Sequence, residues 1–492
     1  MESFLSAVLG ELMTRSINFI INKCFNPPVI AVEDSLQRAL LRAEVIIEEA
    51  MGIHITNQAM RQLLGMLIDA MHRGYYTLDT FRYEPQYAED AKDQAVSHFV
   101  FLSKLNSATG PYFSSTSARN MGPLREALGR LTSVIVDVDE LVVFLMSYPR
   151  LHRQPYSMHI LLSNCMFGRQ MEVEHVINFL LHKQPHGSEG LEVLPIIGPA
   201  RIGKSTLVAH VCKDERIRDH FSKLLFLHDH EFTDDKLAFR EGCGMKDQNS
   251  VSKSNMGKGL LVVLELAGDL NEDAWNKLYH ACKQCVPSGC KIIITSRSDK
   301  VVKLGTTQPL TLKYLSHEVY WYFFKTLTFG SIDPETHPRL TQLAMEIARM
   351  QSGSLNGAYI TSSLLRDNFD IHFWCKVLSF LRGFVQNYLS KFGENPFDLL
   401  NQNRPVQLGR MAVPSEVFMI CHQYQRSSQE EVPDIRIQDV IYGCVKTRGK
   451  FEALVWRSQI PPYYSYVHTC EIRELKTTGA KRKRSMKGGN KS

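Results

Sequence analysis

Long apolar runs are missing from this 492-residue sequence. No stretch approaches the ~18 consecutive apolar residues that span a bilayer, so the sequence does not favour membrane insertion. Charged residues interrupt the first segment, Met1 to Ile21, which also lacks a secretory leader pattern. The 11 cysteines are scattered rather than arranged as a disulfide framework. We therefore expect a reducing, intracellular setting.

A strong net charge is absent as well. The formal net charge is +6, and much of it lies in a C-terminal tail that contains KRKR at 481–484. Three interpretations of this tail are open: a nuclear-import signal, a nucleic-acid contact, and a solvated end. The last is favoured because no aromatic residues interleave with the basic ones. We expect a cytoplasmic protein, with nuclear entry through the tail as the alternative, and nucleic acid is not an expected partner.

Signatures of a zinc site or of a covalent nucleophile are also lacking. Cys282 and Cys285 form one CxxC with Cys290 nearby, but no second CxxC or histidine pair follows at finger spacing. The run HDHE at 228–231 lacks the HExxH spacing of a helical zinc site. No GxSxG motif occurs. We expect packed or free cysteines and a polar loop at these places.

One stretch, LEVLPIIGPARIGKSTL at 191–207, carries a strong signal. Its apolar run breaks at Gly198, and Gly203, Lys204 and Ser205 follow in the pattern GxxxxGK[ST] between a strand and a helix. Backbone amides at such a helix start bind polyphosphate, the lysine reaches the β- and γ-phosphates, and the serine coordinates Mg²⁺. An ordinary glycine turn is the alternative, but four matched positions favour ADP or ATP. The loop residues expected at the nucleotide are Gly198, Arg201, Ile202, Gly203, Lys204, Ser205 and Thr206.

Strands and helices alternate after this P-loop. Strands are expected at 223–227, 260–266, 291–295 and 310–312, with a helix at 272–285. This alternation predicts a parallel α/β sheet with helices on both faces.

Two charged residues end strands of the expected sheet. Glu265 occupies the position of a Walker B acid, where it would hold Mg²⁺, although a solvated strand end is the alternative. Leu266 follows it instead of a second acid, so binding is better supported than hydrolysis. Arg297 follows its strand by two residues, where a guanidinium can reach a γ-phosphate, with a surface arginine as the alternative.

The flanking regions have helical periodicity. Three apolar stripes at 36–50, 60–71 and 124–145 predict an antiparallel bundle before the P-loop, serving either a partner or structure alone. Helical patterns return after the sheet and weaken near Gly393. We therefore expect a multidomain chain of α and α/β regions: a helical bundle at 1–150, a P-loop nucleotide-binding domain at 160–315, a helical lid at 316–392, a winged-helix-like or irregular region at 393–472, and a basic tail at 473–492.

With these residues placed, the chain resembles the plant coiled-coil disease-resistance proteins of the NB-ARC type, especially grass members. The resemblance covers roughly residues 1–390 and rests on separate blocks in the right order, among them MLIDAMHRGYYTLDTFRY, FGRQMEVEHVINFLL and GCKIIITSRSDKV. It implies that Phe167, Gly168 and Arg169 contact adenine and that Arg297 senses the γ-phosphate. It also implies a switch that is closed with ADP and, with ATP, oligomerises and signals in defence.

Several positions depart from the family pattern. Ala200 stands where the family has glycine, which puts a Cβ into a loop that often needs positive φ. Leu266 replaces an acid, GSLNGA at 353–358 replaces GLPLA, and neither an MHD motif nor leucine-rich repeats are found. ATP hydrolysis is therefore expected to be weak at most. The alternative is a nucleotide-poor adaptor or decoy that binds full-length relatives through its N-terminal bundle.

Overall fold

The computed structural model describes a large part of the chain, namely residues 29–51, 53, 55, 57–83, 121–145, 166–182, 191–228, 259–266, 272–285, 290–351, 353–447 and 449–474. The basic tail beyond 474, the residues 229–231 of the HDHE run and the side chain of Cys285 lie outside this description. None of the described helices is both long and apolar enough to cross a bilayer. The chain divides into two compact units, at 1–349 and 350–492.

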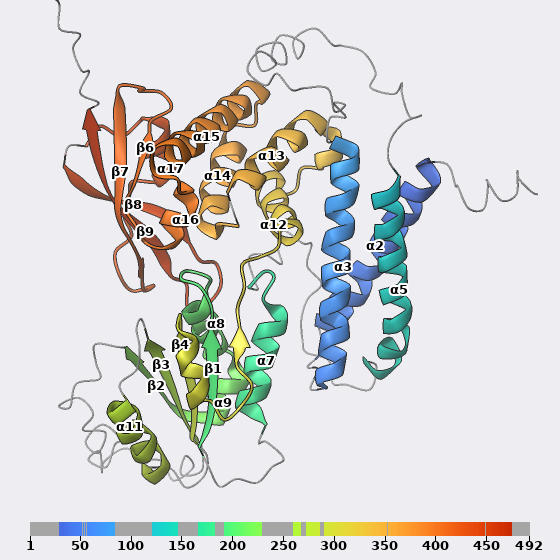
Figure 1. The fold of residues 1–492 in the computed structure, drawn as a ribbon, viewed down its shortest axis with the longest axis vertical. Coiled ribbons are helices and arrows are strands. Elements are labelled where there is room, and N and C mark those ends of the chain that lie inside the picture. Colours follow the sequence, from blue (N-terminus) through green and yellow to red (C-terminus); the bar gives the residue numbers. More distant parts are fainter. Residues whose placement is uncertain are drawn as a thin grey trace, which may run out of the picture. The chain divides into compact units, whose positions relative to one another are not determined.

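Three helices of the first unit form an N-terminal bundle, which comprises α2 (Val29–Met51), α3 (Gln58–Tyr83) and α5 (Gly122–Leu145) (Figure 1). The apolar stripes read from the sequence face its core, because these side chains are all buried: Leu36, Leu40, Ala43, Ile47, Ala50, Met60, Leu67, Met71, Leu124, Leu131, Ile135 and Val138. Their spacing of three and four residues places each set on one face of its helix. Burial of these stripes stabilises the bundle.

The second part of the first unit is a parallel sheet. Its strands are β1 (Glu192–Ile197), β2 (Phe221–His228), β3 (Gly259–Leu266), β4 (Cys290–Ser296) and β5 (Leu310–Thr311). They lie in the order β2-β3-β4-β1-β5, and every pairing is parallel. The expectation of a parallel α/β core is thus confirmed.

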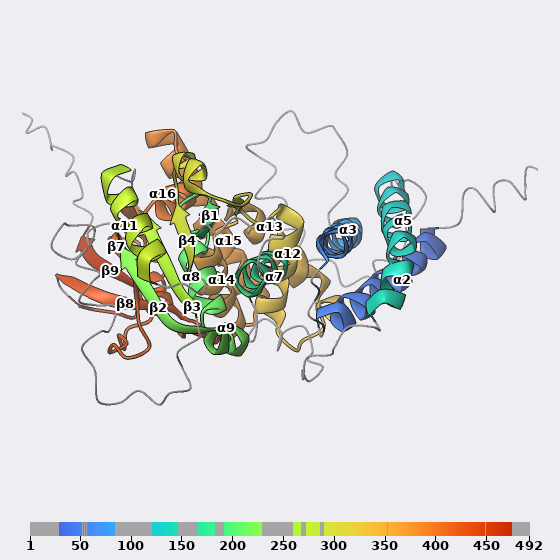
Figure 2. The same ribbon diagram turned by 90° about the horizontal axis from the view of Figure 1, so that it is seen from below.

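Helices cover both faces of the sheet (Figure 2). Leu194 and Ile196 of β1 join a core with α7 (Gln170–Leu181), α8 (Lys204–Val211) and α9 (Glu215–His220). Val193 and Ile197 point to the opposite core, which contains α11 (Glu272–Cys285). Alternate side chains of a strand project to opposite faces, so the nearly continuous apolar sequence of β1 fills both cores.

The first unit continues beyond the sheet through short elements into two helices. The short elements are the 3-10 helices η2 (Asp299–Leu304) and η3 (Pro334–Thr336). The two α-helices are α12 (His317–Phe329) and α13 (Pro338–Met350), and α13 ends where the second unit begins. The side chain of Ser316 caps α12 by accepting a hydrogen bond from the Val319 amide. Such a cap satisfies one of the unpaired amides at a helix start.

The second unit contains α14 (Leu355–Asp367), α15 (Ile371–Phe392), α16 (Pro396–Asn401), α17 (Ile437–Tyr442) and an antiparallel sheet of β6 (Val406–Gly409), β7 (Glu416–Arg426), β8 (Lys450–Arg457) and β9 (Ser465–Glu474). The strand order is β6-β7-β9-β8. The region after Gly393, which the sequence left poorly specified, therefore folds as a regular sheet with helices. The segment expected as one lid, 316–392, contributes α12 and α13 to the first unit and α14 and α15 to the second.

Candidate nucleotide-binding site

The carboxyl ends of three neighbouring strands meet at one edge of the sheet. In the strand register Ile197 of β1 pairs with Ser296 of β4, and Glu265 of β3 pairs with Thr295. Gly198, Glu265 and Arg297 therefore lie at the same edge, where parallel α/β sheets bind their ligands. The structure brings together the residues that the sequence had placed far apart along the chain.

The P-loop between β1 and α8 contains three left-handed residues. Gly198 has φ +151°, Arg201 +57° and Gly203 +94°. A Cβ on Gly198 would lie 2.5 Å from the carbonyl oxygen of Leu312, so only glycine fits there. Ala200 is not among the positive-φ residues of the described chain, so the expected strain from its Cβ is not found.

The start of α8 has a glycine in place of a capping side chain. Its N-cap is Gly203, which offers no side-chain cap. Uncapped amides at a helix start, together with the helix dipole, favour an anion. Ile202 is buried in the core below, so only its backbone can face a ligand, whereas the side chains of Arg201 and Thr206 are partly exposed.

Lys204 is folded back onto its own loop. Its Nζ donates hydrogen bonds to the carbonyl oxygens of Gly198 and Pro199, both at 2.7 Å. The pKa of Lys204 lies at about 8, lowered first by burial and then by the Arg297 guanidinium, while the Glu265 carboxylate opposes both. Burial and a neighbouring cation both disfavour the charged form of Lys204, and a bound polyphosphate would stabilise it.

The residue after Lys204 and the end of β3 supply two neighbouring oxygen groups. The hydroxyl of Ser205 donates a hydrogen bond to Oε1 of Glu265. A hydroxyl and a carboxylate suit Mg²⁺, which keeps several water or phosphate ligands besides a few protein oxygens. Leu266 is buried in the α11 core, so the residue after Glu265 offers no group that could activate water. Arg297, the expected γ-phosphate sensor, is exposed at the end of β4.

The segment 166–169 lies between the P-loop and α12. A Cβ on Gly203 would lie 3.8 Å from Cε of Met166, and one on Gly168, which has φ +66°, would lie 2.9 Å from a methyl of Leu315. Met166 and Leu315 are thus candidates for a nucleotide contact that the sequence did not suggest, because an isolated apolar residue before a glycine carries no specific signal.

The other two expected adenine contacts in this segment have partners of their own. Arg169 is bound to Glu172 at 2.9 Å and to the carbonyl oxygen of Lys313. The ring of Phe167 packs 5.2 Å from that of Phe323 on α12. Their side chains fix the segment to its surroundings, and its backbone remains next to the P-loop.

Lys291 of β4 fixes the helix that follows this segment. Its Nζ donates to the carbonyl oxygens of Phe179 and His182 at the end of α7, at 2.5 and 2.7 Å, and lies 2.7 Å from Glu192 of β1. Unpaired carbonyls at a helix end favour a cation. The buried lysine therefore connects α7 to two central strands.

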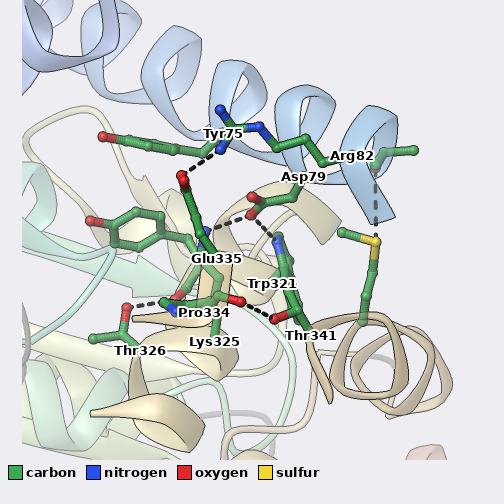
Figure 3. Close-up of polar contacts among 12 residues, drawn as sticks. Tyr75, Asp79, Arg82, Trp321, Lys325, Thr326, Pro334, Glu335 and Thr341 are labelled. Carbon is green, nitrogen blue, oxygen red and sulfur yellow. Dashed lines mark hydrogen bonds and ion pairs between the residues drawn. The ribbon is translucent and has the colours of Figure 1, made fainter. Parts of the chain in front are cut away.

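A polar contact joins the bundle to α12 (Figure 3). Asp79 of α3 is 5% exposed, and its Oδ2 accepts from Trp321 Nε1 at 2.8 Å and from Lys325 Nζ at 2.5 Å. At the end of α3, Arg82 pairs with Glu33 of α2 at 2.5 Å and with Glu335 of η3. The C-terminal half of the block MLIDAMHRGYYTLDTFRY, at 66–83, thus contacts α12 and η3.

Comparisons with known proteins agree with this geometry. Residues 169–332 match the NB-ARC domain family. Disease resistance protein RGA2 of Solanum bulbocastanum is 29% identical over 202 residues, which are 38% of this chain and 20% of that protein. Putative disease resistance RPP13-like protein 1 of Arabidopsis thaliana is 22% identical over 410 residues, which are 77% of this chain and 37% of that protein.

Similarity to solved structures is low. The match to the structure of C. elegans PCH-2 covers 45% of this chain and 70% of that chain, with a TM-score of 0.30 and 13% identity. The chain spans about a fifth of the length of RGA2. Residues 169–332 thus match the NB-ARC domain family, and the chain is similar to plant disease resistance proteins.

Proposed function

We propose that this chain is an intracellular switch of the plant disease-resistance type, operated by exchange between ADP and ATP. The observation that carries the proposal is the P-loop, in which α8 begins without a side-chain cap at the buried Lys204. In this proposal the nucleotide contacts are Phe167, Gly168, Arg169, Gly198, Arg201, Ile202, Gly203, Lys204, Ser205, Thr206 and Arg297, and Mg²⁺ is held by Ser205 and Glu265. The resemblance to grass members of the family belongs to the same proposal.

The contacts of α12 support a role in signalling. This helix packs against the segment 166–169 beside the P-loop and, through Asp79, against the bundle. A nucleotide that moves α12 would therefore change how firmly the bundle is held. The released bundle would bind protein partners, either copies of this chain or full-length relatives. Since Leu266 offers no base, the exchange of ADP for ATP rather than rapid hydrolysis of ATP would determine the state of the switch.

The first test is the nucleotide content of the purified full chain. Denaturation should release close to one ADP per chain, identified by mass spectrometry. Lys204→Ala should weaken ADP binding roughly 10- to 150-fold, because hydrogen bonds to charged groups contribute ~1.5–3 kcal/mol. Lys213→Ala, at an exposed lysine just after α8, should leave the ADP content unchanged. An empty wild-type chain that still binds its partners would favour the adaptor alternative and refute the switch.

A second prediction concerns pH. The free chain holds Lys204 with a pKa of about 8, and a bound polyphosphate should raise this pKa toward its ordinary value of 10.5. The favourable charge is present in the free chain below pH 8 and is lost as pH rises, so ADP affinity should fall about tenfold between pH 7 and pH 9. Calorimetry in two buffers of different ionisation enthalpy should show proton uptake at pH 8.5. Lys204→Arg keeps its charge and should abolish this pH dependence; a fall of equal size in that variant would contradict the assignment.

A further inference from the structure

A buried histidine lies where the bundle meets α12. His72 of α3 is 3% exposed, and its ring stands edge-on to Tyr322 of α12 at 5.1 Å and to Phe167 at 5.8 Å. Among the described residues neither ring nitrogen has a hydrogen-bond partner of normal geometry. A buried polar group without a partner is costly, and a buried charge without a partner costs more.

The charged groups around His72 do not offset this burial. Glu318 of α12 and the backbone of Ile68 favour the protonated form, yet burial outweighs both and lowers the pKa of His72 to about 4. Asp69 and Arg73 on the same helix act on each other and on Glu318. Three other charged groups of the surrounding elements have partners of their own: Lys325 pairs with Asp79, Arg169 with Glu172, and Glu44 of α2 with the hydroxyl of Tyr75.

We propose that mild acidification releases the N-terminal bundle from α12 by protonating His72. The two rings that cover the imidazole belong to α12 and to the segment 166–169, not to the bundle. Separation of the bundle therefore exposes His72 to water, where it binds a proton readily, whereas the docked state excludes the charge. This inference goes beyond the nucleotide switch, because the docked contact and its histidine require no nucleotide.

The size of the effect follows from linkage. With a pKa of about 4 in the docked state and 6.5 in the released state, the released state binds more protons, so docking is strongest above pH 6.5 and weakens as pH falls. The docking equilibrium should drop about tenfold between pH 7.5 and pH 5.5.

Hydrogen exchange of the full chain measures this shift. After correction for the intrinsic pH dependence of exchange, protection of α3 and α12 should fall about tenfold at pH 5.5, while protection of β1 stays constant. His72→Phe keeps an apolar ring but cannot be protonated, so it should retain protection at both pH values. His317→Gln, at an exposed histidine of α12, should behave like the wild type. Glu44, whose pKa is raised by burial, stays intact in all variants, so its titration cannot produce a difference between them.

Several outcomes would overturn the proposal. One is equal wild-type protection at pH 7.5 and 5.5; another is an equal loss in His72→Phe; a third is simultaneous loss of protection in β1, which would indicate general unfolding. If His72→Phe does not fold, the pH dependence of protection in the wild type decides. Protection of α3 and α12 must begin to fall near pH 6.5, and constant protection down to pH 4.5 would contradict the proposal. Failure of ADP binding with an intact acid response would refute the nucleotide switch alone.

Discussion

Asp79→Asn should detach the bundle from α12. The substitution keeps the shape of the side chain and an oxygen that can accept from Trp321, but it leaves the ammonium of Lys325 largely buried without its counter-charge. Removing one partner of a buried ion pair typically costs about 3–5 kcal/mol. Hydrogen exchange of the full chain should show the α3–α12 contact opening more easily by about this free energy.

Two further variants test whether the charge is responsible. Lys325→Met alone should also weaken docking, because it leaves the carboxylate of Asp79 buried and unpaired. The double variant Asp79→Asn/Lys325→Met carries no unpaired charge and should recover much of the loss. Glu335→Gln removes an exposed partner of Arg82 and should change docking by less than about 1 kcal/mol. A double variant no better than either single one would show that the ion pair does not hold the bundle.

Lys291→Met should lower the stability of the nucleotide-binding domain. The change removes the ammonium that donates to two carbonyl oxygens at the end of α7 and pairs with Glu192. We expect a loss of about 3–5 kcal/mol and a fall in melting temperature of about 10 °C, measured by calorimetry. Because α7 follows the segment 166–169 directly, ADP affinity should fall as well.

The matched control is Lys283→Met on α11, at an exposed position, which should leave the melting temperature nearly unchanged. Adding Glu192→Gln to Lys291→Met removes the negative charge that faced the lysine and should restore part of the stability. A melting temperature within 2 °C of the wild type in Lys291→Met would show that the lysine contributes little.

Local patterns in the sequence were enough to predict the parallel sheet. The P-loop has a fixed spacing, and the strands around it are short apolar runs bounded by turn residues. Because strands in a parallel sheet align their carboxyl ends, the sequence alone predicts that Glu265 and Arg297 lie at one edge. The bundle was predictable for a similar reason, since each of its stripes keeps one helical period.

The second sheet was hidden by its irregularities. The pairing of β7 with β9 shifts between Ile420 and His422, and that of β8 with β9 shifts between Leu454 and Trp456. A bulge interrupts the alternation of inward and outward side chains, so neither strand keeps a period of two. Polar residues also face inward, as the buried Gln423 and His468 show.

Contacts between distant segments could not be read from periodicity. His72, Phe167 and Tyr322 are far apart in the sequence and carry no shared motif, yet their rings form one cluster. The partners of Arg169 likewise depend on how the chain enters α12, which no local pattern encodes.

The link between Leu312 and α12 limits how far this helix can move. The amide of Leu312 donates to the carbonyl oxygen of Ile197 at 2.8 Å, which tethers this strand end to the P-loop. Only four residues lead from Leu312 to the cap at Ser316, so the start of α12 can lie at most about 14 Å from this hydrogen bond. The start of α12 is therefore expected to stay near the P-loop while the rest of the helix rotates, and the contact of Arg169 with the carbonyl oxygen of Lys313 restricts this rotation.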